Sequence, residues 1–238
     1  MDIKQHILYI SYDGMTDFLG QSQVIPYLIE LQQYGYQFTI LSCEKKEKYG
    51  LRGTYIQKLL NSYNIKWQVL KFSCTPPILA KYYDIFQLKK KALELHKKHH
   101  FDMTHCRSYI AADVGYYLKE KCDVNFLFDM RGFWVDERVD GGMWNLKNPF
   151  YWLAYQSYKK KETSYINRAD YLIALSKAGK KEMQKWPKFE QTPIEIIPCS
   201  TDFDLFFLTE KSIKKHNRKN LGFDNNSLII SYLGSIGT

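Results

Sequence analysis

Two side chains with catalytic potential stand close together in the stretch THCRSY, residues 104–109. His105 can orient or deprotonate a hydroxyl group, and Arg107 can grip a phosphate or a carboxylate through two parallel hydrogen bonds. His105 lies near the end of FDMTHC, residues 101–106, which we predict to be a buried β-strand, and Arg107 directly follows it. We take His105 and Arg107 as catalytic candidates; the alternative is that His105 is a structural histidine.

A second group of candidates follows in the stretch 128–144, FDMRGFWVDERVDGGMW. Asp129 and Arg131 leave a predicted strand together, and Glu137 comes next in what we expect to be a loop. Aromatic faces beside charged groups suit a sugar or a lipid-linked acceptor. Asp129, Arg131 and Glu137 are therefore candidates for acceptor binding. The alternative is an internal salt-bridge network that closes a long loop.

The stretch YDGMTDFLGQSQV follows the first predicted strand and contains two glycines. It has neither the G-x-G-x-x-G pattern of dinucleotide-binding folds nor a P-loop. Gly20 nevertheless precedes a predicted helix, whose free backbone amides and dipole can receive an anion. Gly20 and Gln21 are therefore candidates for facing the phosphates of a ligand; the alternative is that Gly20 only allows a tight turn.

Strands and helices alternate along the chain. Short apolar strands separated by helices indicate a parallel sheet covered on both faces. We therefore expect a doubly wound α/β fold, Rossmann-like, with three α/β/α layers. The candidates above all follow strands, which is where open parallel sheets bind ligands. The expected strands are 6–12, 37–43, 66–72, 101–106, 125–130, 170–175 and 194–199; the expected helices are 21–34, 55–60 after a charged loop, 79–99, 109–119, one starting at Asn148-Pro149 and one capped by Ser176.

Composition narrows the class of protein. The chain has 238 residues, 45% of them hydrophobic, which is enough for a substantial core. Its apolar runs are too short to span a bilayer and no signal peptide is visible, so we expect a cytoplasmic location. The five cysteines show no metal-binding spacing, and we expect reduced thiols, no metal and no cofactor.

The net charge of +9 arises from an excess of lysine. On the predicted helix 79–99, Lys90 and Lys91 fall opposite an apolar stripe formed by Ile85, Leu88, Ala92 and Leu95. This pattern favours a solvated helix face, with peripheral contact to an anionic membrane as the alternative. We expect no nucleic-acid partner.

The end of the chain suggests a second domain. A polar, basic stretch at 211–221 is followed by a predicted strand, Leu228–Leu233, which runs into Gly-Ser-Ile-Gly. We expect an amino-terminal domain at 1–208, an interdomain linker at 209–226, and at 227–238 the first strand of a truncated second domain.

Several of these segments together resemble a known family. DFLGQSQVIPYLIELQQYGYQFTILS is similar to the Gly-rich loop, first helix and second strand of GT-B glycosyltransferases of the retaining family four. ADYLIALSKAGKKEM resembles that family's strand and Ser-capped helix, IEIIPCSTDFDLF its crossover, and IISYLGSIG the first strand of its second domain. The order and spacing of these segments, which cover nearly the whole chain, carry the resemblance.

The resemblance implies two Rossmann-like domains, the first of which binds the acceptor and the second the nucleotide-sugar donor. It implies sugar transfer with retention, without a metal, to a glycan or lipid-linked acceptor in polysaccharide or bacterial cell-surface glycan synthesis. His105 matches the first of two histidines found in many members, whereas Arg107 replaces the second. The family's remaining donor-binding residues belong to the second domain, so we expect this piece alone to be inactive.

Two other functions stay open. A GT-B-type sugar-nucleotide epimerase would use catalytic carboxylates on a small soluble substrate. A non-catalytic Rossmann-like module would instead attach to a membrane or a partner through its basic face. Vesicle binding that weakens as salt rises would favour this second alternative.

Overall fold

The computed structural model describes residues 5–186, 189, 192–201, 207, 209–224 and 226–232. By their contacts the residues form two units, Met1–Cys199 and Ser200–Thr238. Among the described residues, the first unit holds the sheet and its helices, and the second holds one helix. The predicted domain boundaries at 208 and 226 stay a prediction.

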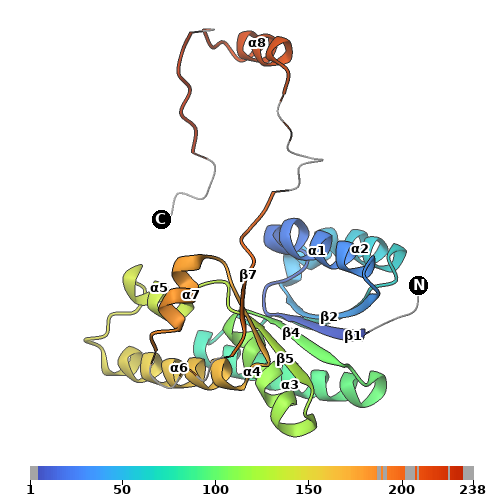
Figure 1. Ribbon diagram of the computed structural model, residues 1–238, viewed down its shortest axis with the longest axis vertical. Helices are drawn as coiled ribbons and strands as arrows, with labels where there is room; N and C mark the ends of the chain where they lie inside the picture. Colours follow the sequence, from blue (N-terminus) through green and yellow to red (C-terminus); the bar gives the residue numbers. More distant parts are fainter. Residues whose placement is uncertain are drawn as a thin grey trace. The chain divides into compact units, whose positions relative to one another are not determined.

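Seven parallel strands form one sheet in the order β3-β2-β1-β4-β5-β6-β7. Helices connect them and cover both faces (Figure 1), which confirms the predicted doubly wound α/β fold. Each predicted strand of this unit is present, within a few residues of its expected ends. The strands are β1 Gln5–Ser11, β2 Tyr36–Glu44, β3 Lys66–Lys71, β4 Met103–Arg107, β5 Asn125–Asp129, β6 Tyr171–Ala174 and β7 Ile194–Ile196.

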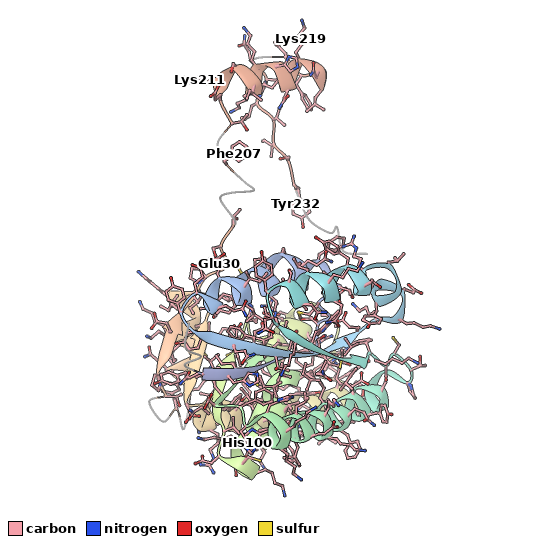
Figure 2. The ribbon with its side chains drawn as sticks, turned by 90° about the vertical axis from the view of Figure 1, so that its right-hand side faces the viewer. Glu30, His100, Phe207, Lys211, Lys219 and Tyr232 are labelled. Carbon is pink, nitrogen blue, oxygen red and sulfur yellow. The ribbon has the colours of Figure 1, made fainter. Side chains whose placement is uncertain are left out.

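The helices of the first unit pack on the two faces of this sheet. Alternate residues of β1 point to opposite faces, so Ile7 and Tyr9 join one core cluster while Leu8 and Ile10 join the other. Figure 2 shows Glu30 of α1 and His100 at the end of α3 on opposite sides of the sheet. The helical elements are η1 Gly20–Val24, α1 Ile25–Gln32, α2 Lys46–Ser62, α3 Pro77–His99, α4 Ser108–Cys122, α5 Trp134–Asp140, α6 Pro149–Arg168 and α7 Lys177–Met183.

Local sequence signals explain several of these boundaries. The Asn148 side chain accepts a hydrogen bond of 2.9 Å from the Phe150 amide and caps α6. The Ser176 hydroxyl accepts one of 3.0 Å from the Gly179 amide and caps α7. Both caps were expected because a short polar side chain satisfies amides that the first turn leaves free. The predicted stripe on α3 is buried, as expected for its core-facing side: Ile85, Leu88, Ala92 and Leu95.

Two predictions within the first unit are wrong. The charged segment expected as a loop before residue 55 is helical, because α2 begins at Lys46 and buries Gly53, Ile56 and Leu60 on one face. The segment expected as a loop after β5 contains α5, in which Val135 is fully buried. Propensity did not reveal either helix because a few buried side chains, rather than a long apolar pattern, hold each of them.

The second unit contains α8, Lys211–Asn220, in the stretch expected to be a linker or surface helix. Lys211 and Lys219 lie at its two ends (Figure 2), and α8 has no buried residue. Residues 227–232 form no strand, and Leu228 and Ile230 are exposed. The described residues 228–232 therefore show no strand, and the predicted start of a second domain at 227–238 stays a prediction. Leu233 lies outside the described residues.

None of the described helices is both long enough and apolar enough to cross a membrane.

Candidate functional site

The parallel strands β1 and β4 lie side by side in the sheet. From β1 the chain adds β2 and β3 on one side, and from β4 it adds β5 to β7 on the other, so the order of the strands reverses at this point. In open parallel sheets, ligands bind beyond the carboxyl ends of the strands at such a reversal. Here those ends are Ser11 of β1 and Arg107 of β4, which are paired in register. The loops that follow them are therefore the first place to look for a site.

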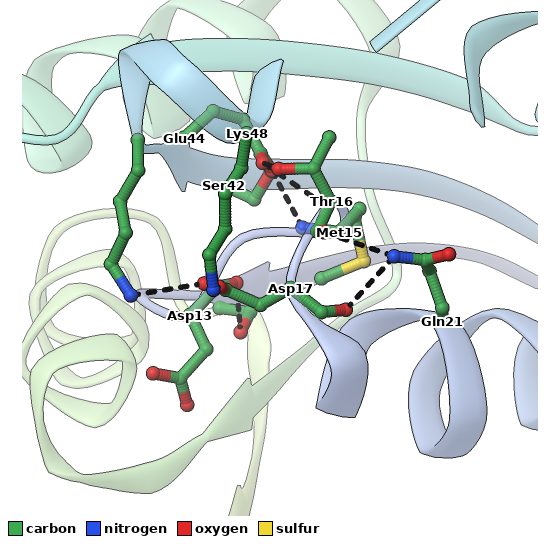
Figure 3. Close-up of polar contacts among 10 residues, drawn as sticks. Asp13, Met15, Thr16, Asp17, Gln21, Ser42, Glu44 and Lys48 are labelled. Atoms are coloured by element: carbon green, nitrogen blue, oxygen red, sulfur yellow. Dashed lines mark hydrogen bonds and ion pairs between the residues drawn. The ribbon is translucent and has the colours of Figure 1, made fainter. Parts of the chain in front are cut away.

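The loop after β1 is held in place by one buried carboxylate, that of Glu44 at the end of β2 (Figure 3). Its oxygens accept hydrogen bonds from the amides of Met15, at 2.6 Å, and Thr16, at 3.2 Å. They also accept hydrogen bonds from the hydroxyls of Thr16, at 2.5 Å, and Ser42, at 2.6 Å. Four donors on one buried carboxylate make this loop a fixed part of the site.

Gly20 and Gln21, predicted to face donor phosphates, lie at the end of this loop. Gly20 is buried, and an added Cβ there would lie 2.6 Å from the Met15 Cα, so close backbone packing requires glycine. The Gln21 amide donates to the Asp17 carbonyl at 3.1 Å, and its side chain to the Thr16 carbonyl at 2.9 Å. The Gln21 amide is therefore engaged within the helix, and the phosphate role of both residues stays a prediction.

Four predicted residues come together at the ends of β4 and β5, in what we call the His105 cluster: His105, Arg107, Asp129 and Arg131 with Gln23 of η1. The Gln23 Oε1 accepts hydrogen bonds from Arg107 at 2.9 Å and from Arg131 at 3.1 Å. The Asp129 Oδ2 lies 3.7 Å from both the His105 Nε2 and the Arg131 Nη1. One carboxylate thus lies between a histidine and the Arg131 guanidinium, and Gln23 links Arg131 to Arg107.

The backbone at this cluster is strained. Ser108, directly after β4, and Arg131, just after β5, have φ angles of 66° and 57°. Non-glycine residues rarely adopt this left-handed conformation, and it recurs at functional sites. The strain therefore supports a functional role for the ends of these two strands.

Two atoms of the cluster lack the hydrogen bonds that buried polar atoms normally make. They are the Nε2 of His105 and the Oδ1 of Asp129. The imidazole also packs against Tyr9, with 4.7 Å between ring centroids, and Tyr27, at 5.9 Å. Burial, with a contribution from Asp129, raises the pKa of Tyr9 and Tyr27, so both phenols stay protonated. The cluster thus has spare capacity to hydrogen-bond a ligand.

Glu137, the last predicted acceptor residue, is exposed on α5 and makes no recorded contact with the cluster's side chains among the described residues. Its carboxylate approaches Gly132 so closely that an added Cβ would clash with it. Its neighbour Asp136 instead binds Tyr155 at 2.8 Å and Lys159 at 3.0 Å. The alternative of an internal network therefore holds for Asp136, while the role of Glu137 stays a prediction.

A polar cavity of about 350 Å³ opens at the carboxyl ends of β1 to β4. It is large enough for a small ligand. Asp13 and Asp17 contribute carboxylates to it, and Asp17 is paired with Lys45, at 3.3 Å, and with Lys48. These lysines lower the pKa of Asp17 although burial opposes them. The lining residues are Tyr12, Asp13, Asp17, Cys43, Lys45, Phe72, Lys81, Ser108, Ile110, Trp134 and Arg138.

A second, mainly apolar groove of about 790 Å³ lies between α3, α5 and α6. It shares two of its lining residues, Lys81 and Arg138, with the polar cavity. None of the seven predicted site residues lines either space. The remaining lining residues of this apolar groove are Pro76, Tyr82, Trp144, Phe150, Tyr151, Leu153, Ala154, Ser157 and Tyr158.

Comparison with known proteins identifies the family. The model of Glycosyltransferase Family 4 matches residues 20–205, from the end of the β1 loop to beyond β7. The chain belongs to this family. The resemblance seen in the sequence is thereby confirmed, and with it the expected GT-B relationship of the fold.

Solved structures agree with a Family 4 fold. Sucrose-phosphate synthase from Thermosynechococcus elongatus matches with a TM-score of 0.64 at 14% identity, over 94% of this chain and 54% of its own. A glycosyltransferase from Rickettsia africae matches with a TM-score of 0.57 at 19% identity, over 93% and 51%. HepE of Anabaena, solved with UDP and glucose, matches with a TM-score of 0.53 at 15% identity, over 92% of this chain and 50% of its own.

The chain thus spans about half the length of these structures. At such identities the likeness shows the fold alone. No curated protein matches the chain.

Several residues of the candidate site were not predicted. Arg138 stands in the stretch 128–144 and Glu44 directly follows the predicted strand 37–43, but nothing in their spacing assigns them a role. Gln23 and Lys81 carry no local signal, because their partners are 84 or more residues away or on another helix. Only the packed sheet shows that these side chains meet.

Proposed function

We propose that this chain is the acceptor-binding part of a retaining nucleotide-sugar glycosyltransferase. The observation that carries the proposal is the polar cavity, which combines carboxylates and aromatic rings at the strand ends where this fold binds ligands. A sugar presents hydroxyl groups for the carboxylates and apolar ring faces for the aromatic side chains. The membership of Family 4 supports the same reaction class.

In this proposal the acceptor sugar occupies the polar cavity. Asp13 is exposed at its rim and can accept hydrogen bonds from acceptor hydroxyls, while Asp17 is held by Lys45 and Lys48. The rings of Tyr12, Phe72 and Trp134 form apolar parts of the wall. Arg131 and Glu137 stand outside the lining of the cavity, where they would frame a larger acceptor.

The His105 cluster would then face the sugar that is transferred. Sugar transfer is expected to pass through an oxocarbenium-like transition state, and positive groups stabilise the departing diphosphate. Arg107 and Arg131 supply positive charge, and the free Nε2 of His105 can bond a hydroxyl of that sugar. Gly20 and Gln21 would lie on the phosphate side. HepE, solved with UDP and glucose, is a precedent for a nucleotide and a sugar in this fold.

The remaining parts of the proposal concern the whole protein. A second Rossmann-like half would bind the nucleotide-sugar, so the 238 residues alone would not catalyse transfer. The reaction would need no metal or other cofactor. We place it in the cytoplasm, with peripheral contact to the inner membrane face during synthesis of polysaccharide or lipid-linked glycan.

A transfer assay tests this function on a polypeptide that joins this chain to a donor-binding domain. Each assay offers one nucleotide-sugar, either UDP-glucose, UDP-N-acetylglucosamine or GDP-mannose. The acceptors are soluble glycans or lipid-linked glycans from a lipid extract. We expect one donor to support transfer, and the His105→Ala and Arg131→Ala variants to reduce kcat/KM at least 10-fold. Isomerisation of a nucleotide-sugar without transfer would instead show an epimerase, and binding without either reaction would show a non-catalytic module.

A further inference from the structure

The polar cavity and the apolar groove meet at two cationic side chains. Lys81 of α3 and Arg138 of α5 line both spaces. Both also stand over the same aromatic ring, because the Lys81 Nζ lies 4.9 Å and the Arg138 Cζ 4.4 Å from the Trp134 ring centroid. Two positive charges are therefore held close together at the junction.

Within the described part of the chain, neither cation has a carboxylate partner. The Arg138 Nε is buried and makes no hydrogen bond. The nearby acidic residues are engaged elsewhere or exposed: Asp136 binds Lys159, Asp17 binds Lys45 and Lys48, and Asp13 and Glu137 face solvent. Burial and the charge of Arg138 lower the pKa of Lys81. Such a pair is complementary to an anion, and a phosphate would relieve the repulsion.

The groove on the other side of these cations is apolar and open. Tyr82 of α3 and Phe150 and Leu153 of α6 line it, yet they remain 52%, 54% and 63% exposed. At about 790 Å³ it offers more room than the polar cavity. Exposed apolar surface of this kind marks a binding surface, and its position beside a cationic pair suits a hydrocarbon chain attached to an anionic group.

We propose that the acceptor is a sugar joined through a phosphate or diphosphate to a long-chain lipid. The sugar occupies the polar cavity, the phosphate lies between Lys81 and Arg138, and the lipid chain occupies the apolar groove. This inference rests on the proposed function and names its acceptor class. The polar, cationic and apolar parts follow one another in the order in which such a molecule presents its sugar, phosphate and hydrocarbon.

Ligand binding to the 238-residue chain tests the inference. It is measured by calorimetry and by tryptophan fluorescence, to which Trp134 and Trp144 in the linings of the two spaces contribute. The probe is dodecyl phosphate below its micelle concentration. Dodecyl maltoside supplies the same chain with an uncharged head, and inorganic phosphate supplies the anion alone. We expect dodecyl phosphate to bind at least 10-fold more tightly than dodecyl maltoside and at least 100-fold more tightly than inorganic phosphate.

Variants separate the two parts of the site. Lys81→Met and Arg138→Gln should each weaken dodecyl phosphate binding about 10-fold and leave dodecyl maltoside binding unchanged. Leu153→Asp should weaken both detergents, because it places a charge in the apolar groove. Lys58→Met is the matched control, since Lys58 is exposed on α2 and lines neither space. Circular dichroism checks that each variant is folded.

Three results would overturn the inference. Equal affinity for dodecyl phosphate and dodecyl maltoside would show that the cations play no role in binding. Equal affinity for dodecyl phosphate and inorganic phosphate would show a site for a free anion and no lipid site. Equal weakening by Lys58→Met would indicate attraction by net charge, as at any anionic membrane surface. Failure of the proposed function is distinguishable: transfer to a soluble acceptor without dodecyl phosphate binding refutes only the lipid site, whereas binding without transfer refutes only the function.

Discussion

The carboxylate of Glu44 accepts a hydrogen bond of 2.6 Å from the backbone amide of Met15. This contact ties the end of β2 to the loop that follows β1, and Figure 3 shows the same carboxylate reaching Thr16 and Ser42. The Ser42 hydroxyl in turn accepts a hydrogen bond of 2.9 Å from the Trp67 indole. The shape of the loop beside the polar cavity therefore depends on one buried acid.

Replacing Glu44 should destabilise the protein strongly. Glu44→Ala leaves the amides of Met15 and Thr16 buried without their acceptor, and we expect a loss of about 3 kcal/mol in the free energy of unfolding. Urea denaturation measures it. Glu47→Ala is the control, because Glu47 is exposed on α2 and its removal should cost under about 0.5 kcal/mol. Equal effects of the two changes would show that the Glu44 contacts carry no net stability.

Two glycines should respond to the same substitution with opposite signs. Gly20→Ala forces a Cβ to within 2.6 Å of the Met15 Cα, so we expect a loss of about 1–3 kcal/mol from overpacking. Gly50 lies within α2 with open space around it, so Gly50→Ala should stabilise by about 0.5–1 kcal/mol. Urea denaturation of both variants checks this; a stable Gly20→Ala protein would show that the loop after β1 can shift freely.

Gln23 offers a way to separate stability from function. It holds Arg107 and Arg131 with a neutral oxygen, which leaves their positive charge available to a donor phosphate. Gln23→Glu should raise the free energy of unfolding by about 1 kcal/mol through charge-assisted hydrogen bonds. It should also lower kcat/KM for transfer about 10-fold, because the new carboxylate repels phosphate. Both are measured in a polypeptide that includes a donor domain.

Gln57→Glu, on α2, is the matched control for that change and should alter neither quantity appreciably. A Gln23→Glu variant that is stabilised yet transfers sugar normally would contradict a role for the two arginines near the donor phosphate.

Much of the fold could be predicted because the strands of a parallel sheet are buried on both faces and form short apolar runs. The caps at Asn148 and Ser176 marked helix starts because a short polar side chain there accepts a hydrogen bond from a backbone amide of the first turn. The missed part of α2 lacks such a signal, since its charged first turns differ little from a loop.

The site could be predicted only in part. His105, Arg107, Asp129 and Arg131 follow two neighbouring strands, and the pattern of parallel sheets brings such residues together. Lys81 and Arg138 belong to different helices, so no spacing along the chain links them. Their proximity depends on how α3 and α5 pack around Trp134, which is a property of the folded protein.

Histidines gather at the opposite, amino-terminal edge of the sheet. His6 of β1 and His99 of α3 have ring centroids 5.9 Å apart, and His96 and His100 lie 6.1 Å apart. Burial lowers the pKa of His6, His96 and His99, and neighbouring cationic groups lower it further. These include Lys66 beside His6 and His99 and Lys98 beside His99, whereas Asp102 opposes the shift of His6.

Stability should therefore fall when the pH is lowered through about 6.5, the ordinary pKa of histidine. Below it the unfolded chain binds protons that the folded histidines resist, so the free energy of unfolding rises with pH in this range. Urea denaturation at pH 7.5 and 6.0 measures the difference. The double change His6→Gln and His99→Gln should reduce it by at least half, whereas His216→Gln on the exposed helix α8 should leave it unchanged. An unaltered pH dependence in the double variant would show that other groups govern it.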